Sequence, residues 1–427
     1  MRNPRLPGPG PQTPAAGSLK YVIFLGDGMA DLPIEELGGK TPLQVAQKPA
    51  MDRIAREGRC GSLVTVDDDM PPGSEVANLT VLGYDPHQCY QGRGVIEAAS
   101  IGVNLGPADV ALRCNLICVE EERIRNHSAG HISTEEAVEL INFLSVRLGT
   151  GDVKFHPGIS YRHVVVLKPT GVFEKDPPST ELECFPPHDH VGEPVNELKI
   201  RPRTPEARAT ADLLNDLVRR SGYLLAAHPI NVRRRQRGKD PANSIWFWSP
   251  GRKPVMATFQ QLYGLTGAVI SAVDLIQGLG IYAGLNVIKV PGATGLIDTN
   301  FEGKADACLE ALKSADFVYV HVEAADEAGH SKDLKQKIRA IEYLDSRLIA
   351  RVLKGIEDDG ISAVIALLPD HPTPVAKGNH IHGAVPVAIR DPRHAPDSVS
   401  AYDEVSVAAG SLGLMRGSQF FQTFLKG

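Results

Sequence analysis

Three short apolar runs, each followed at once by acidic residues and histidines, constrain the fold of this chain more than any other feature. The runs occupy residues 21–25 (YVIFL), 317–322 (FVYVHV) and 363–368 (AVIALL). Each is rich in β-branched or aromatic side chains, which is typical of parallel strands that are covered on both faces. Helical patterns separate the runs, so the two ends of the chain predict an α/β fold.

Further predicted elements extend this pattern. Residues 41–57, with Pro42 near the start, and residues 332–358 carry apolar side chains at three- and four-residue spacing and are predicted helices. Residues 286–290 form another predicted strand, which follows a helix-like segment at 270–285. Strand and helix therefore alternate near both termini.

The middle of the chain has a different pattern. Its strands are shorter, as at 111–119 and 163–167, and prolines are frequent. A chain of 427 residues also exceeds what one hydrophobic core usually supports. We therefore predict a discontinuous outer domain, residues 19–100 and 250–427, and an inserted α+β domain at 101–249.

Composition narrows the class of partner. A formal net charge of -6 argues against a nucleic-acid or anionic-membrane surface, and no apolar run approaches the roughly 20 residues that span a bilayer. The six cysteines are too scattered for a disulfide framework, so a reducing cytoplasm fits best. Cys114 and Cys118 are close, but we interpret them as small buried hydrophobes and not as metal ligands. Residues 1–18, rich in Pro and Gly, predict a disordered tail and not a secretory signal.

Candidate metal ligands follow the three apolar runs. Ligands of open parallel sheets bind beyond the carboxyl ends of the strands. The side chains found there are Asp27 after the first run, Asp326 and His330 after the second, and Asp370, His371, His380 and His382 after the third. Carboxylate oxygen and imidazole nitrogen together suit divalent ions. Each residue alone could belong to an ordinary loop, but their convergence on one sheet edge predicts a binuclear metal site.

Ser74 gives two metal ions a chemical purpose. It lies in PPGSEVAN (71–78), between a Pro/Gly turn and a helix-like run. An aliphatic hydroxyl is a poor nucleophile at neutral pH, and a divalent cation at its oxygen removes that limit. A helix N-terminus would also stabilise a phosphoryl group on Ser74. The alternative is that Ser74 only caps the helix, and the local sequence by itself favours this alternative.

Four motifs in order resemble a known enzyme family. They are FLGDGMAD (24–31), PPGSEVAN followed by LGYDP (71–86), DEAGH (326–330) and DHPTP (370–374). From about Lys20 to the C-terminus, the chain resembles the archaeal-type cofactor-independent phosphoglycerate mutases of the alkaline phosphatase superfamily. A bacterial branch of that family includes proposed homoserine kinases. The resemblance implies an α/β, alkaline-phosphatase-like parallel-sheet metalloenzyme core with an inserted α+β domain that binds the substrate and closes over the metals.

The resemblance also implies a role for each candidate ligand. Asp27, Ser74, Asp370 and His371 would hold one ion, and Asp326, His330 and a later histidine would hold the other. The family has this histidine five residues before a Val-Pro element, which here selects His380 and leaves His382 as the weaker substitute. Mn²⁺ is the expected ion, with Mg²⁺, Zn²⁺ and Co²⁺ as alternatives.

The inserted domain is expected to bind a small phosphorylated carboxylate. The candidates are His127, Arg162, His163, Arg234, Arg237 and Lys239. The planar fork of Arg pairs well with carboxylate and phosphate oxygens. A single Arg could equally be a solvated surface charge, but the run at 231–239 favours anion binding as a cluster. Arg93, in a glycine-bearing turn, could meet a phosphate or form a surface salt bridge.

The implied reaction interconverts 3-phosphoglycerate and 2-phosphoglycerate through a phosphoserine at Ser74, as in glycolysis and gluconeogenesis. One alternative is a homoserine-kinase-like phosphotransferase of the same family. A second is a metal-dependent phosphomonoesterase, which would result if the insert failed to exclude water. A third is a non-catalytic binding protein, against which the intact Ser74 and the full ligand set argue.

Overall fold

The computed structural model describes residues 19–427, which form two compact units. The first, here called the outer unit, comprises residues 19–89 and 256–427, and the second, the insert, comprises residues 90–255. The insert starts earlier than the sequence suggested, because helix α5 (Arg93–Ser100) packs on strands of the insert. The tail predicted at 1–18 lies outside the described residues.

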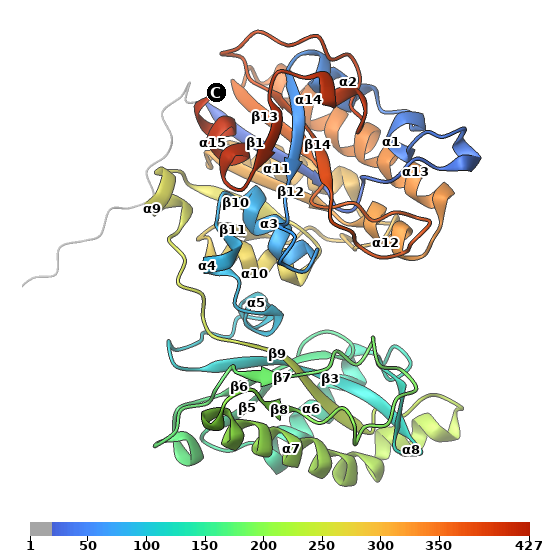
Figure 1. Ribbon diagram of the computed structural model, residues 1–427, viewed down its shortest axis with the longest axis vertical. Coiled ribbons are helices and arrows are strands. Elements are labelled where there is room, and N and C mark those ends of the chain that lie inside the picture. The colour runs from blue at the N-terminus through green and yellow to red at the C-terminus, as the bar shows by residue number, and fades with distance from the viewer. Residues whose placement is uncertain (1–18) are drawn as a thin grey trace, which may run out of the picture. The chain divides into compact units, whose positions relative to one another are not determined.

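Eight strands of the described chain form the sheet of the outer unit, in the order β11-β10-β12-β1-β13-β14-β2-β15 (Figure 1). The strands are β1 (Lys20–Gly26), β2 (Arg59–Val64), β10 (Gly267–Ile270), β11 (Asn286–Ile288), β12 (Phe317–Val322), β13 (Ala363–Leu368), β14 (Ala384–Arg390) and β15 (Gly413–Arg416). The three apolar runs of the sequence are the adjacent parallel strands β12, β1 and β13. Leu25 of β1 is paired with both His321 and Leu368, so these strands end at the same edge.

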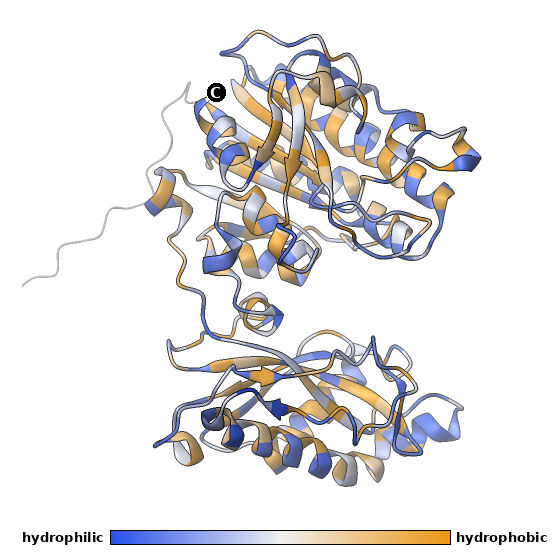
Figure 2. Ribbon diagram, viewed as in Figure 1, coloured by the Kyte–Doolittle hydropathy of each residue, from blue (hydrophilic) through white to orange (hydrophobic). Residues whose placement is uncertain are grey.

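Helices cover both faces of this sheet. An apolar core that includes Phe24, Val320 and Leu367 packs one face against α1 (Pro42–Val45), α2 (Pro49–Arg56), α11 (Phe301–Leu312), α13 (Leu334–Tyr343) and α14 (Ala350–Asp358). The other face meets α3 (Ser74–Val81), α10 (Asp274–Tyr282) and α15 (Gln419–Lys426), where Phe421 and Phe424 contact Phe317. Shorter helices are α4 (Pro86–Cys89), α9 (Phe259–Tyr263) and α12 (Ala324–His330), with 3-10 turns at Glu35–Leu37 and Ser406–Ala409. In Figure 2 the strands of the sheet are mainly hydrophobic.

Three predicted helices have different bounds in the structure. The helix predicted at 41–57 is two helices, because Pro49 begins α2 as a new N-terminus. The helix predicted at 332–358 contains a π-helical segment, Leu344–Ile349, between α13 and α14. The segment predicted as a helix at 270–285 begins with the last residue of β10, and only α10 is helical.

Strand β14 was not predicted, because it contains a proline. Pro within an apolar run normally indicates an edge strand or no strand. Here β13 pairs with β14 from Arg390 only as far as Ala388, so Pro386 lies beyond that pairing and is matched to Ser62 of β2. The missing N–H therefore leaves the ladder to β13 intact.

The insert is built on an antiparallel sheet. Its strands are β3 (Val110–Glu120), β4 (Arg123–Asn126), β5 (Val153–His156), β6 (Arg162–Leu167) and β9 (Ser244–Gly251), and β7 (Leu182–Glu183) pairs separately with β8 (Arg201–Pro202). Helices α6 (Thr134–Leu148), α7 (Arg208–Ala226) and α8 (Pro229–Gln236) share a core with β3 and β9, whereas 3-10 turns lie at Gly171–Phe173 and Pro205–Ala207. Helix α5 approaches β3 closely because Gly94 has no side chain: a β-carbon there would lie 2.8 Å from Arg113 N. Cys114 packs in this core, and burial raises the pKa of its thiol. None of the described helices is long and apolar enough to cross a membrane.

Candidate metal and nucleophile site

The ends of β1, β12 and β13 bring the predicted acids and histidines to one edge of the sheet. Asp27 follows β1, and Asp370 and His371 follow β13. Asp326 and His330 lie on α12, which starts two residues after β12. Asp27, Asp326, Asp370 and His371 are all buried. Residues that are far apart in the sequence therefore share one small polar region.

The hydroxyl of Ser74 points into this region. Ser74 is the first residue of α3, and Gly73 occupies the N-cap position without a side-chain cap. The Ser74 Oγ atom instead lies 3.0 Å from His371 Nε2. The interpretation of Ser74 as a helix cap is therefore wrong. Its hydroxyl is placed at the N-terminus of a buried helix, where negative charge is favoured.

Asp27, Asp370 and His371 form the first group of candidate ligands. The His371 Nε2 atom is 3.6 Å from Asp27 Oδ1 and 3.4 Å from Asp370 Oδ2. One ligand atom from each of the three residues lies within 4.8 Å of the others. Together with Ser74 Oγ, these atoms offer oxygen and nitrogen donors around one point.

Gly28 allows Asp326 to lie close to this group. Its φ is +61°, and a β-carbon at this position would overlap the Asp326 carboxylate. Its N–H donates to Asp370 Oδ1 at 3.1 Å. The second glycine of the GDG sequence is therefore required both by backbone conformation and by the close approach of two carboxylates.

Asp326, His371 and His380 form the second group, again with ligand atoms within 4.8 Å of one another. His330 joins it: His330 Nε2 is 3.1 Å from Asp326 Oδ2 and 2.9 Å from His380 Nε2. The His330 Nδ1 atom contacts the Gly378 carbonyl at 2.9 Å, and a carbonyl can only accept. In the neutral ring, the proton on Nδ1 leaves Nε2 available as a ligand atom.

The two later histidines have different surroundings. His380 Nε2 lies 3.4 Å from Asp326 Oδ1, inside the second group. His382 is exposed, and its Nε2 donates to the Met70 carbonyl at 2.8 Å. The structure thus brings His380 and not His382 to the predicted ligands.

Electrostatics in the site favour a bound cation. Burial raises the pKa of Asp27 well above its usual value, and the neighbouring Asp370 and Asp326 raise it further. Burial opposes ionisation of Asp326 as well, but hydrogen bonds to His330 and His380 hold its pKa well below normal. The Asp326 carboxylate in turn raises the pKa of His330 to about 9. These carboxylates are crowded in a region of low dielectric, which positive charge would relieve.

One carboxylate oxygen is placed as a ligand of a divalent cation would be. Asp27 Oδ1 is buried and has no hydrogen-bond partner in the described structure. A buried carboxylate oxygen without a partner is costly unless an ion is coordinated there. The mixed carboxylate, imidazole and hydroxyl donors suit Mn²⁺, Zn²⁺ or a similar ion.

The residues that were predicted to bind substrate have different surroundings within the insert. His163 faces the core, where its Nδ1 accepts from Gly158 N at 2.9 Å and burial lowers its pKa to about 3. Arg234 is also buried: it donates to the Ala129 carbonyl at 2.6 Å and pairs with Glu136 at 2.5 Å. Arg237 and Lys239 are exposed after α8, whereas His127 and Arg162 both lie against Tyr161. The predicted cluster at 231–239 is therefore not a single anion site, since Arg234 is held by protein groups.

Known proteins resemble this chain along almost its whole length. A model of the family described as 2,3-bisphosphoglycerate-independent phosphoglycerate mutase matches residues 55–231. The enzyme of that name from Methanosarcina barkeri is 49% identical over 96% of this chain and 100% of its own length. The chain belongs to this family.

Further relatives and solved structures also match almost the whole chain. The second 2,3-bisphosphoglycerate-independent phosphoglycerate mutase of Methanothermobacter thermautotrophicus is 46% identical, covering 96% of this chain and 98% of its own. A solved protein of Pyrococcus horikoshii matches 96% of this chain and 97% of its own, with a TM-score of 0.80 and 29% identity. The cofactor-independent phosphoglycerate mutase of Thermoplasma acidophilum matches 96% and 99%, with a TM-score of 0.66 and 27% identity. The predicted α/β fold of this mutase family is therefore confirmed.

The insert of this mutase-family chain contains a cationic face that the sequence analysis did not assemble. We define the cationic face as Arg93, Arg113, His127, Arg162 and His188. The Arg113 guanidinium stacks 4.4 Å from the centroid of Trp248, whose ring also contacts His188. Burial lowers the pKa of Arg113, and Arg93 and Arg162 lower it further although Glu97 is 3.0 Å away. The available signal was one Arg within the apolar strand sequence VALRCNLIC.

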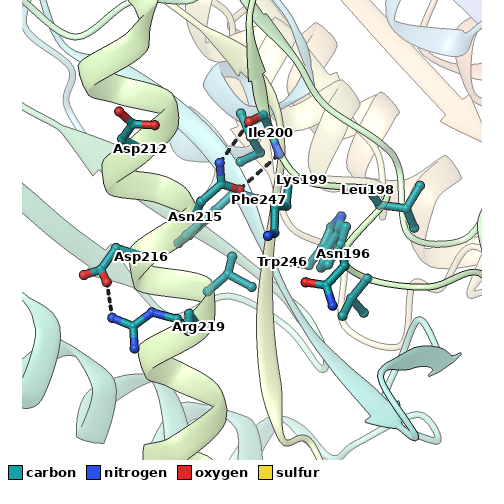
Figure 3. A pocket seen from close by; sticks show the side chains of 12 residues that line it. Asn196, Leu198, Lys199, Ile200, Asp212, Asn215, Asp216, Arg219, Trp246 and Phe247 are labelled. Atoms are coloured by element: carbon teal, nitrogen blue, oxygen red, sulfur yellow. Dashed lines mark hydrogen bonds and ion pairs between the residues drawn. The ribbon is translucent and has the colours of Figure 1, made fainter.

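The insert also has a separate cavity of about 530 Å³ between α7 and β9 (Figure 3). Trp246, Leu198 and Val218 contribute apolar surface, and Lys199 and Arg219 lie at its polar parts. None of the residues of the cationic face lines it. Nothing in its geometry connects it to phosphoryl chemistry.

Proposed function

We propose that the chain interconverts 3-phosphoglycerate and 2-phosphoglycerate without bisphosphoglycerate, as an isomerase of glycolysis and gluconeogenesis. The observation that carries this proposal is the Ser74 hydroxyl, which lies 3.0 Å from a histidine shared by both groups of candidate ligands. Membership of the mutase family supports the same reaction. The six free cysteines support a reducing cytoplasm as its compartment.

Two divalent cations, with Mn²⁺ as our first choice, complete the proposed site. Asp27, Ser74, Asp370 and His371 would hold one cation, and Asp326, His330 and His380 would hold the other. When bound, the cations would neutralise negative charge on the transferring phosphoryl group and favour the ionised hydroxyl of Ser74. The mixed oxygen and nitrogen donors support Mn²⁺.

The reaction then consists of two phosphoryl transfers. In the first, a bond forms between Ser74 Oγ and phosphorus while the bond from phosphorus to the 3-oxygen of glycerate breaks. The serine proton ends on that departing oxygen. In the second, the 2-oxygen of glycerate takes the phosphoryl group, and its proton returns to Ser74. The N-terminus of α3 favours the negative phosphoryl group that Ser74 carries between the two transfers.

The insert has two tasks in this proposal. The cationic face supplies Arg and His side chains that suit the carboxylate of glycerate, since guanidinium pairs with both oxygens of a carboxylate. The insert must also keep water from the phosphoserine, because hydrolysis would turn the enzyme into a phosphatase. Arg162 suits the first task, because it is exposed, whereas Arg113 is buried and paired with Glu97.

One assay separates the proposed reaction from its alternatives. The purified chain with Mn²⁺ receives 3-phosphoglycerate, without bisphosphoglycerate, coupled to enolase, and in a second reaction it receives homoserine and ATP. We expect turnover in the first reaction with no release of phosphate. Turnover in the second alone would replace the mutase by a kinase, and free phosphate in the first would indicate a phosphomonoesterase.

A further inference from the structure

His321 is a fully buried histidine that none of the proposed catalytic steps uses. It lies near the end of β12, between β10 and β1 in the sheet. Its side chain has no exposure, and its Nε2 lies 3.0 Å from Asp27 Oδ2. Its Nδ1 lies 3.2 Å from the hydroxyl of Ser271, the residue that follows β10. Three adjacent strand ends are therefore joined by side-chain contacts.

The partners of Ser271 hold its hydroxyl beside His321. The backbone N–H of Val273 donates to Ser271 Oγ at 3.0 Å and occupies one of the two lone pairs of the serine oxygen. Gln277 Nε2 donates to the Ser271 carbonyl at 3.0 Å and holds the turn. The hydroxyl proton of Ser271 can point to His321 Nδ1, which accepts it when the ring proton is on Nε2.

The ring of His321 carries its proton on Nε2 when Asp27 is ionised, as it would be when it holds a cation. A neutral imidazole has one N–H, and full burial disfavours the charged form. An ionised carboxylate only accepts, so Nε2 donates to Asp27 Oδ2. The other oxygen, Asp27 Oδ1, is the buried atom without a hydrogen-bond partner. The hydrogen bond thus distinguishes the two oxygens of one carboxylate.

We propose that His321, held by Ser271 at Nδ1, is a positioning residue that fixes the Asp27 carboxylate so that Oδ1 faces the first cation. The proposal rests on the cation site of the proposed function. Side chains that orient metal ligands in this way typically change metal affinity about 10- to 100-fold when they are removed.

The backbone supports the same arrangement. Lys304 Nζ donates to the His321 carbonyl at 3.0 Å from within the core. Two residues earlier on the same face of β12, the Tyr319 hydroxyl donates to Asn78 Oδ1. Asn78 Nδ2 in turn donates to Asp370 Oδ2 at 3.0 Å. Strand β12 therefore holds two carboxylates of the first group through separate buried contacts.

Two substitutions of His321 provide the test. His321→Gln keeps an N–H donor near the position of Nε2, whereas His321→Met fills similar space without a donor. Mn²⁺ binding is followed by titration calorimetry and by the paramagnetic resonance signal of free Mn²⁺, and folding of the metal-free proteins is followed by thermal unfolding. A His330→Gln background weakens the second group and isolates the site that contains Asp27.

We expect His321→Met to weaken Mn²⁺ binding at this site about 10- to 100-fold. His321→Gln should stay within about threefold of the wild type, and Ser271→Ala should lie between the two, since it removes only the group beside Nδ1. Equal affinity in His321→Met and wild type would overturn the proposal, as would an equal loss in the Gln and Met variants. A wild-type chain that takes up no Mn²⁺ would overturn the proposed cation site itself, and this proposal with it.

Discussion

At the scale of single residues, Ser74 differs from a capping serine in the direction of its hydroxyl. Ser133 is a true cap, because its side chain accepts from the backbone N–H of Glu136. The Ser74 hydroxyl instead meets His371, and Gly73 takes the cap position. The two serines therefore serve as a matched pair for separating chemistry from stability.

Ser74→Ala should lower kcat by a factor on the order of 10⁴ or more, because it removes the atom that forms the bond to phosphorus. Its Mn²⁺ content should change little, since the carboxylates and histidines remain. Ser133→Ala should do the opposite: activity is kept and stability falls by about 1 kcal/mol. Steady-state kinetics, metal analysis and urea unfolding measure these effects. A Ser74→Ala enzyme with most of its activity would remove Ser74 from the reaction.

The raised pKa of His330 predicts that cation binding releases a proton. In the cation-free protein the Asp326 carboxylate raises the pKa of His330 to about 9, so the ring is charged at pH 7.5. A cation must displace that proton, so affinity should rise between about pH 6.5 and pH 9 and then level off. Calorimetry in two buffers of different ionisation enthalpy counts the protons released. His330→Gln is the control, and an undiminished count in that variant would contradict the assignment.

At the scale of elements, the turn after β1 sets the spacing of the carboxylates. Gly28 and Gly38 both have positive φ, at +61° and +67°. A β-carbon on Gly28 would overlap Asp326, whereas a β-carbon on Gly38 would meet no atom within 4 Å. The same substitution therefore adds backbone strain at both positions and a collision at only one.

Gly28→Ala should cost more than the roughly 1–3 kcal/mol of left-handed strain alone and should weaken Mn²⁺ binding at least about tenfold. Gly38→Ala should show only the strain, with Mn²⁺ binding unchanged. Thermal unfolding and Mn²⁺ titration of both variants measure the difference. Similar Mn²⁺ affinity in the two variants would mean that the turn does not set the carboxylate spacing.

Much of the outer unit could be predicted from the sequence, because short segments of the sequence indicate its strands and the ligands that follow them. The apolar runs at β1, β12 and β13 indicate buried strands. The geometry of parallel sheets then places the acids that follow these strands at one edge. Strand β14 was missed because Pro386 argues against a strand unless the extent of its pairing is known. His321 was hidden for a similar reason: inside an apolar run, nothing local shows that its ring meets Asp27.

At the scale of the whole molecule, the two units divide the proposed work. The outer unit contains the nucleophile and the candidate ligands, and the insert contains the cationic face. The arginines of this face were only partly predictable, because a run such as RRRQRGK reveals charge but not orientation. Within that run Arg234 is buried against Glu136, whereas Arg162 is exposed beside Tyr161.

Arg162→Met should raise KM for 3-phosphoglycerate roughly 10- to 100-fold, because a charge-assisted hydrogen bond to an anion contributes about 1.5–3 kcal/mol. Mn²⁺ binding should be unaffected, since the ligands lie in the outer unit. Arg219→Met is the matched control: it is an exposed arginine of the same unit, paired with Asp216, outside the cationic face. Equal KM values for the two variants would remove Arg162 from substrate binding.

Transfer of the phosphoryl group between the two oxygens of glycerate, shielded from water, is tested most directly by phosphorus NMR in water enriched with ¹⁸O. The chain with Mn²⁺ is given 3-phosphoglycerate and no bisphosphoglycerate, and each product is read by its isotope shift. The account predicts 2-phosphoglycerate whose phosphoryl oxygens contain no ¹⁸O, with no inorganic phosphate. Inorganic phosphate that carries ¹⁸O, or unchanged 3-phosphoglycerate, would contradict it.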